Sequence, residues 1–251
     1  MRVRVRTAIT PPSTERAVTS TEWLELLGSG EIEILGRMPW SSNATFLVLV
    51  STPQHEDRAI YKPGRGERPL RDFPDRIYRR EVAAYELSVA LGLDVVPETI
   101  VREHAPLDEG SLQRFIDADY DEHYFTMLED PRYDDALRTI AAFDLLLNNA
   151  DRKGGHLLKD GDDHLWGIDN GLSFHVYPKL RTVMWDFAGE VVPEVVRAGC
   201  ERLCDEVPAA VAELIDRDEC SALRRRAAEL ADSGRFPFPD PSLRQHPWPL
   251  V

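Results

Sequence analysis

Short runs of alternating or β-branched apolar residues dominate the N-terminal half of the chain, a pattern typical of strands that bury one face. The five runs are 31–38, 44–51, 58–62, 95–103 and 110–116. Between the third and the fourth, residues 75–91 repeat apolar side chains at helical spacing. A short helix, capped by Ser20 or Thr21 and ended by Gly28, precedes all of them. These runs predict a β-rich unit with a helix packed on it.

The C-terminal half has mainly helical periodicity. One helix is predicted over about 134–149, and two or three more over 193–233 with a break before Pro208. An apolar hairpin, Leu157-Leu158 with Leu165-Trp166, lies between these helical regions. The remaining segments are predicted to lack regular structure: a connector at 117–133, a loop at 175–193 and an extended strap at 236–251, which holds five prolines.

Together the two halves predict an α+β fold with a β-rich N-lobe and a mainly helical C-lobe. We expect an N-terminal extension over 1–29, the N-lobe over 30–117 and the C-lobe, with its proline-rich strap, over 118–251. A chain of 251 residues is long enough for two lobes that share a cleft and short for two independent domains.

Charge and composition exclude several classes of partner. The net charge of −14, from 30 basic and 44 acidic residues, argues against nucleic acid or an anionic membrane as the main partner. We interpret two basic runs, 76–80 and 224–226, as solvated helix faces. No apolar run approaches the ~20 residues of a membrane span, and residues 1–20 lack the apolar centre of a signal peptide, so we expect a cytoplasmic protein. Three cysteines suggest neither a disulfide framework nor a zinc site.

Most of the candidate catalytic residues lie between residues 143 and 175, where two short acidic motifs occur. They are Asp151-Arg152-Lys153-Gly154-Gly155-His156 and Ile168-Asp169-Asn170-Gly171. Phosphoryl transfer needs one carboxylate to orient the attacking hydroxyl and another to hold the metal that bridges the phosphates, and Asp151 and Asp169 fit these roles. Lys153 is close enough to Asp151 to neutralise charge on the moving group. Gly171 is expected to let the backbone turn sharply after Asp169.

These motifs resemble the phosphatidylinositol 3-/4-kinase-like family, in particular its type II phosphatidylinositol 4-kinase branch and small bacterial relatives, with HipA-type kinases more distant. Asp151-Arg152 matches the family's Asp-Arg catalytic loop, and 168–171 matches its Ile-Asp-Asn-Gly segment. His156 stands where the family has a metal-binding asparagine. The resemblance covers roughly 30–190 and implies a two-lobed, protein-kinase-like fold that uses ATP.

Two further residues acquire roles through this resemblance. Lys62 ends the third predicted strand where the family places a lysine that pairs with the α- and β-phosphates. Glu81, within Glu81-Val82-Ala83-Ala84-Tyr85, resembles the family's Glu-Ala-Gly-Ala-Tyr segment, and we prefer it to Glu86 as the partner of Lys62. Asp144 lies in an apolar helix stripe, where an unpaired carboxylate is costly, so we expect it to brace Arg152 or the catalytic-loop backbone.

The nucleotide is expected to contact two loops of the N-lobe. Ser41, Ser42 and Asn43 lie where kinase folds place a phosphate-covering loop, although an ordinary hairpin turn has the same composition. Gly110 to Ile116 resembles the Gly-Ser-Phe-Gln-Leu-Phe-Val segment of the type II kinases, which leads into their adenine-binding hinge. This resemblance places the base at Gln113, Phe115 and Ile116.

The sequence therefore predicts an ATP-dependent kinase with Asp151, Arg152 and Lys153 as the catalytic set and Asp169 and His156 as metal ligands. Mg²⁺ prefers oxygen ligands, and an imidazole suits Mn²⁺, so either ion is a candidate cofactor. The alternative is a nucleotide-binding pseudokinase that acts as a regulatory or interaction module. The hydroxyl acceptor stays open between a small molecule, an inositol lipid and a protein, and nucleotidyl transfer and the oligomeric state stay open too.

Overall fold

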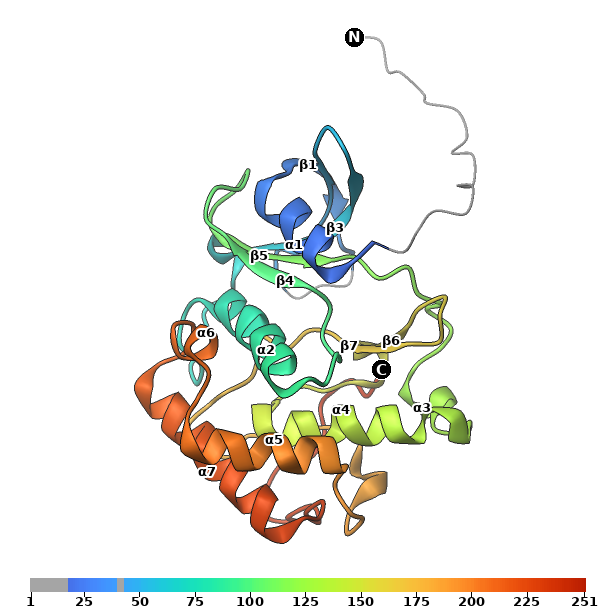
Figure 1. The fold of residues 1–251 in the computed structure, drawn as a ribbon, viewed down its shortest axis with the longest axis vertical. Coiled ribbons are helices and arrows are strands. Elements are labelled where there is room, and N and C mark those ends of the chain that lie inside the picture. Colours follow the sequence, from blue (N-terminus) through green and yellow to red (C-terminus); the bar gives the residue numbers. More distant parts are fainter. Residues whose placement is uncertain (1–17, 40–42) are drawn as a thin grey trace.

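The structure is a computed structural model that describes residues 18–39 and 43–251. Its elements fall into a β-rich N-terminal lobe and a mainly helical C-terminal lobe (Figure 1). The predicted α+β fold with a β-rich N-lobe and a mainly helical C-lobe is thereby confirmed. Among the described residues, no helix has both the length and the apolar character that crossing a bilayer requires.

The N-lobe is built on one antiparallel sheet with the order β1-β2-β3-β5-β4. Its strands are β1 (Glu31–Arg37), β2 (Phe46–Ser51), β3 (Glu56–Pro63), β4 (Thr99–Arg102) and β5 (Gly110–Arg114). Alternate side chains of β2 and β3 point to one face, which buries Val48, Val50, Ala59 and Tyr61. Helix α1 (Ser20–Ser29) covers this face with Trp23, Leu26 and Leu27. Thus α1, which belongs to the segment 1–29, packs onto the N-lobe sheet.

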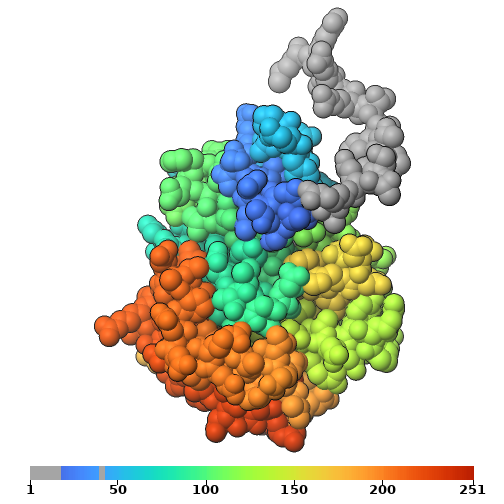
Figure 2. Space-filling model, in the orientation of Figure 1, coloured from blue at the N-terminus to red at the C-terminus, as the bar shows by residue number. Residues whose placement is uncertain are grey.

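Helix α2 (Ile77–Leu91) lies between the sheet and the helical lobe and contacts both. In the space-filling view it occupies the surface between the two lobes (Figure 2). Arg80, on its buried side, pairs with Glu219 of the C-lobe and donates through Nε to the Ser173 carbonyl at 3.1 Å. The interpretation of the run 76–80 as a solvated face is therefore wrong for Arg80. This buried pair fixes α2, and with it Glu81, to the C-lobe.

The C-lobe packs its helices around α4. The helices are α3 (Tyr124–Met127), α4 (Asp134–Leu147), α5 (Glu194–Asp205), α6 (Ala209–Ala212) and α7 (Arg217–Ser233). Single 3-10 turns of this lobe are η2 (Pro131–Tyr133), η3 (Gly154–His156) and η4 (Trp185–Phe187), while η1 (Gly64–Gly66) follows β3 in the N-lobe. Helix α4 is buried along Leu137, Ile140, Phe143 and Leu147, while α5 and α7 pack against each other (Figure 1). The core therefore sits directly beneath the loop that follows α4.

Two further pieces complete the C-lobe. A hairpin of β6 (Leu157–Lys159) and β7 (Leu165–Gly167) follows η3. Residues 236–251, here called the strap, contain neither helix nor strand and run back across the lobe. The Gln245 carbonyl accepts from the Thr182 amide, and the Leu250 carbonyl accepts from the Gly154 amide at 2.7 Å. The strap therefore lies against the loop that carries the first acidic motif.

Candidate active site

The side chain of Lys62 connects the N-lobe with the C-lobe. It stands near the end of β3, and its Nζ donates to Glu81 of α2 and, at 2.8 Å, to Oδ1 of Asp169. Glu86, the alternative partner, is not in this group, and Oε2 of Glu81 instead accepts from the Asn170 amide at 2.9 Å. One ammonium group thus joins a strand, a helix and a C-lobe loop.

The charges of this group depend on one another. Burial disfavours the charge of Lys62, but the carboxylates of Asp169 and Glu81 outweigh it and raise the pKa of Lys62. Burial raises the pKa of Glu81, against the opposing effect of Lys62. Lys62 in turn lowers the pKa of Asp169, although burial acts in the other direction. Lys62 and Asp169 are therefore both charged at neutral pH.

The segment that carries Asp169 is held by an unusual backbone conformation and a close contact. Asp169 itself adopts a positive φ of 59°, which aspartate tolerates better than most residues. Gly171 has no positive φ, and a Cβ there would lie 2.7 Å from Ile77 Cγ2 and 3.0 Å from Glu81 Oε1. The expectation that Gly171 lets the backbone turn sharply was therefore wrong. The unusual backbone conformation is at Asp169, and the role of Gly171 is to let α2 approach closely.

Asp151 and Lys153 form a second charged pair, located in the loop after α4. Lys153 Nζ lies 3.0 Å from Asp151 Oδ2, and both side chains are partly exposed. The Asp151 amide donates to Oδ1 of Asn149 at 3.0 Å, which fixes the start of the loop. Burial raises the pKa of Asp151, while Lys153 opposes the rise and Asp169 adds to it. The loop thus presents a carboxylate and an ammonium group side by side.

Arg152, which the sequence grouped with the catalytic residues, points into the interior. Its guanidinium makes two bonds to the carboxylate of Asp144, at 2.8 and 2.9 Å. It also donates to the Ile168 carbonyl at 2.6 Å and to Oδ1 of Asn170 at 2.7 Å. The expected role of Asp144 as a brace for Arg152 is confirmed. Arg152 therefore joins the two acidic motifs from the interior, with only 1% of its surface exposed.

His156 lies next to Asp169 in the C-lobe. Its Nε2 lies 3.5 Å from Oδ2 of Asp169, and its ring is mostly buried. Burial lowers the pKa of His156 to about 4, although Asp169 acts against this. The imidazole is therefore neutral at physiological pH, which is the form that binds metals.

Asp169 and His156 are two side chains that could act together as metal ligands. They offer one carboxylate and one neutral imidazole, and no group of three His, Cys, Asp or Glu side chains within residues 18–39 and 43–251 is placed to hold a metal ion. Mg²⁺ in nucleotide sites is commonly held by one or two carboxylates with substrate phosphates and water as the other ligands. A nitrogen donor moves the preference from Mg²⁺ toward Mn²⁺.

The three residues predicted to bind the base have different surroundings in the structure. Gln113 is paired in register with Ile60 of β3 and Thr99 of β4, and its side-chain amide donates to Thr99 Oγ1 at 2.8 Å. Ile116 packs with Leu158 and Trp166, which come from the β6–β7 hairpin. The Phe115 amide donates to the Arg58 carbonyl at 3.2 Å. The sequence identified this hairpin as apolar but did not connect it with the base.

The predicted phosphate-covering loop is seen only in part. Asn43 accepts from the Arg68 amide at 3.1 Å through Oδ1, and the neighbouring Ala44 amide donates to the Gly66 carbonyl. Ser41 and Ser42 lie outside the described residues. Asn43 therefore joins the β1–β2 turn to the loop after β3.

Fold and site together define a two-lobed protein of kinase-like fold, with a lysine–glutamate pair and two aspartates at its cleft. The chain belongs to the same family as Protein Rv2133c of Mycobacterium tuberculosis (strain ATCC 25618 / H37Rv). The two sequences are 37% identical over an alignment of 262 positions, which includes 89% of this chain and 94% of that protein. No family model matches the sequence. Among solved structures, the proinflammatory kinase CtkA of Helicobacter pylori is similar over 83% of this chain and 94% of its own, with a TM-score of 0.48 and 12% identity.

Proposed function

We propose that the protein is an ATP-dependent kinase that transfers the γ-phosphoryl group to a hydroxyl. The observation that carries the proposal is Lys62, whose ammonium group bridges Glu81 and Asp169 from opposite lobes. A charged lysine held in a cleft by two carboxylates is the arrangement that positions nucleotide phosphates beside a metal ligand.

Each charged residue of the cleft has a role in this proposal. Lys62 binds the α- and β-phosphates and Glu81 holds Lys62 in place, because the ion pair restricts the lysine side chain. Asp169 and His156 would hold the metal, which when bound neutralises phosphate charge. Asp151 orients the acceptor hydroxyl, and Lys153, 3.0 Å from it, stabilises charge on the transferred group.

The base is placed at the connection between the lobes, over 116–118. Among the described residues, no backbone partner occurs for Ile116, Asp117 or Ala118, which leaves their N–H and C=O groups for a base. Leu158 and Trp166, below them, provide an apolar floor. We accordingly keep the boundary between N-lobe and C-lobe at residue 117.

We further infer that the chain is a phosphatidylinositol 3-/4-kinase-like enzyme. Support comes from the Ile168-Asp169-Asn170-Gly171 segment, in which Asn170 accepts from Arg152 and donates to the Gly167 carbonyl at 3.0 Å. Gly171 packs against α2 in the same segment. The acceptor class is left open by these contacts.

A second candidate function is that of a nucleotide-binding pseudokinase. One observation favours it: His156 stands beside Asp169 in place of the expected asparagine, and no group of three His, Cys, Asp or Glu side chains in the described part of the chain is placed to hold a metal ion. Two ligands bind a metal weakly without nucleotide phosphates. Both candidates bind a nucleotide, but only the kinase turns it over.

The test is a calorimetric titration of ATP into the purified protein with Mg²⁺, with Mn²⁺ and with EDTA. We expect metal-dependent binding that is lost in Asp169→Ala and kept in Asp162→Ala, an exposed aspartate of the β6–β7 turn. Acceptor-free ATP hydrolysis measured in parallel should disappear in Asp151→Asn while binding persists. Binding without any hydrolysis would select the pseudokinase, and no binding under any condition would overturn both candidates.

A further inference from the structure

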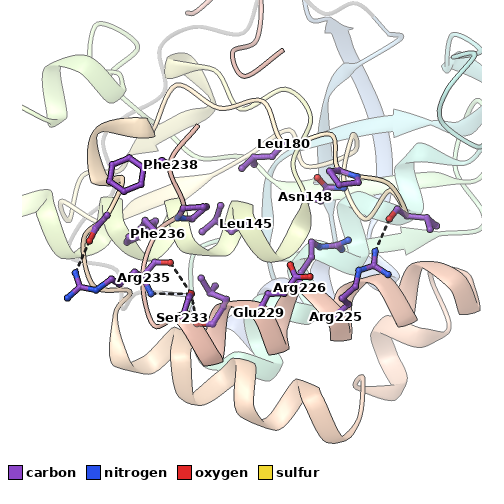
Figure 3. Close-up of a pocket in the computed structure, with 15 residues that line it drawn as sticks. Leu145, Asn148, Leu180, Arg225, Arg226, Glu229, Ser233, Arg235, Phe236 and Phe238 are labelled. Atoms are coloured by element: carbon purple, nitrogen blue, oxygen red, sulfur yellow. Dashed lines mark hydrogen bonds between the residues drawn. The ribbon is translucent and has the colours of Figure 1, made fainter. Parts of the chain in front are cut away.

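A separate cavity of about 620 Å³ lies in the C-lobe between α4, α7 and the first residues of the strap (Figure 3). Its walls are mostly apolar and come from four parts of the chain. They include Leu145, Leu180, Leu230, Phe236 and Phe238. A cavity of this size is within the range of sites that enclose small ligands. None of its lining residues belongs to the candidate active site.

The cavity also carries an excess of positive charge. Arg225, Arg226 and Arg235 line it together with one acidic residue, Glu229, in a protein whose net charge is −14. In the described part of the chain, none of these three arginines forms an ion pair with a carboxylate. Their hydrogen bonds go to backbone carbonyls: Arg225 to Val176, Arg226 to Leu146 and His175, and Arg235 to Gly189.

Arg226 has a donor without an acceptor. Its Nε and Nη1 are used at 2.8 and 3.3 Å, but Nη2 is buried and has no hydrogen-bond partner in the described residues. A buried guanidinium N–H that lacks an acceptor costs free energy, and an anion is the partner that best offsets this cost. Burial lowers the pKa of Arg226 to about 10, which still leaves it charged at neutral pH. The interpretation of the run 224–226 as a solvated face is therefore wrong for Arg226.

The charged and aromatic parts of the lining overlap only at Arg235. Arg226 and Asn148 lie at one side of the cavity, and Phe236 and Phe238 lie at the other, with Leu145 between them (Figure 3). Arg235 lies on the side of the phenylalanines, where its guanidinium donates to the Gly189 carbonyl at 2.8 Å. A ligand that satisfies both ends carries its negative charge at one end and an apolar body behind it. A free inorganic anion leaves the apolar walls uncovered, and a neutral apolar molecule leaves Arg226 without an acceptor.

We propose that this cavity is a binding site for a single-chain amphipathic anion, with its carboxylate or phosphate head at Arg226 and its acyl or alkyl chain against Phe236 and Phe238. The wall at Asn148 connects the cavity to the loop before Asp151. Asn148 donates to the His175 and Tyr177 carbonyls at 2.9 and 2.8 Å and accepts from the Lys179 amide. Occupancy therefore stabilises residues 175–180 as well as the ligand.

The experiment is calorimetry of the full chain below the micelle concentration with dodecanoate, dodecyl phosphate, dodecanol and inorganic phosphate. We expect the two amphipathic anions to bind with one-to-one stoichiometry, and dodecanol and inorganic phosphate to bind at least about tenfold more weakly. Comparison of dodecanoate with dodecyl phosphate distinguishes a fatty acid from a phosphorylated lipid as the natural source. Equal binding of dodecanol and dodecanoate, or no binding of either anion, would overturn the proposal.

Two variants locate the ligand. Leu180→Trp narrows the cavity and leaves all three arginines, so it should strongly weaken binding, whereas Leu70→Trp on the exposed N-lobe surface should not. Arg226→Met should weaken dodecanoate about tenfold and leave dodecanol unchanged, with Arg217→Met, at the other end of α7, as the matched control. If Arg226→Met fails to fold, Leu180→Trp and hydrogen exchange of residues 175–180 with and without dodecanoate still decide the proposal. Retention of dodecanoate binding by a folded Leu180→Trp variant would contradict it.

Discussion

Arg152 and Asp144 form a two-bond ion pair in which each side chain is only 1% exposed, with Nε–Oδ2 and Nη2–Oδ1 distances of 2.8 and 2.9 Å. The pair ties the loop after α4 to the helix itself. Through its other bonds, Arg152 reaches Ile168 and Asn170, which flank Asp169. One buried guanidinium therefore sets the relative positions of both acidic motifs.

Removal of one partner of this pair is expected to be costly. Arg152→Met leaves Asp144 as a buried carboxylate without its cation, and such changes typically destabilise proteins by about 3–5 kcal/mol. Urea unfolding should show the loss as a lower midpoint. Arg197→Met, which breaks an exposed ion pair with Glu194 on α5, is the control and should leave the midpoint almost unchanged. Equal midpoints for Arg152→Met and the wild type would contradict the role of Arg152 as a brace.

A substitution at Gly171 tests the contact between the Asp169 segment and α2. In Gly171→Ala the new Cβ meets Ile77 and Glu81, so we expect a destabilisation of roughly 1–3 kcal/mol by overpacking. Displacement of the Glu81 carboxylate should also weaken ATP binding through Lys62. Gly28→Ala is the matched control: a Cβ there meets nothing within 4 Å, and alanine favours the helix. Opposite signs for the two alanine variants in thermal unfolding are the expected result.

His156 makes the stability of the metal-free protein depend on pH. Its folded pKa of about 4 lies below its value of 6.5 in an unfolded chain, so the unfolded state binds more protons between these values. The contribution is fully present above pH 6.5 and is lost as the pH falls toward 4, by an amount on the order of 3 kcal/mol. His156→Asn cannot titrate and should flatten the curve of unfolding free energy against pH over this window, measured in EDTA. The same replacement at the exposed His246 controls for the substitution itself, and a curve that keeps its full slope in His156→Asn would contradict the assignment.

Local patterns in the sequence predicted most of the N-lobe because a half-buried strand shows its alternation directly. The run at 44–51 appears as β2, and 58–62 lies within β3. The run at 95–103 is only β4 from Thr99 onward, because the Val95 carbonyl accepts from the Gly167 amide of β7. That partner is more than seventy residues away in the sequence, so no local pattern predicts the contact. The short helix α3 was missed for a different reason: four residues are too few to show a helical period.

In the candidate site, the order of residues along the chain predicted which residues lie close together. It did not predict in which direction each side chain points. The sequence grouped Lys62 with Glu81, and the structure places them in contact. It also grouped Arg152 with Asp151, but adjacent side chains point in different directions, and Arg152 turns inward. Arg80 and Arg226 were misplaced because their partners lie on distant elements.

The last prediction concerns the metal, and it rests on the proposed nucleotide site. With His156 beside Asp169, ATP should bind more tightly with Mn²⁺ than with Mg²⁺, because an imidazole nitrogen suits Mn²⁺ better. His156→Asn replaces that nitrogen by an amide oxygen and should reduce or reverse the difference, by several-fold in the ratio of the two dissociation constants measured by calorimetry. His156→Leu removes the donor altogether and should weaken binding with both ions. An unchanged Mn²⁺ to Mg²⁺ ratio in His156→Asn would show that the imidazole does not bind the metal and would leave Asp169 as the single protein ligand.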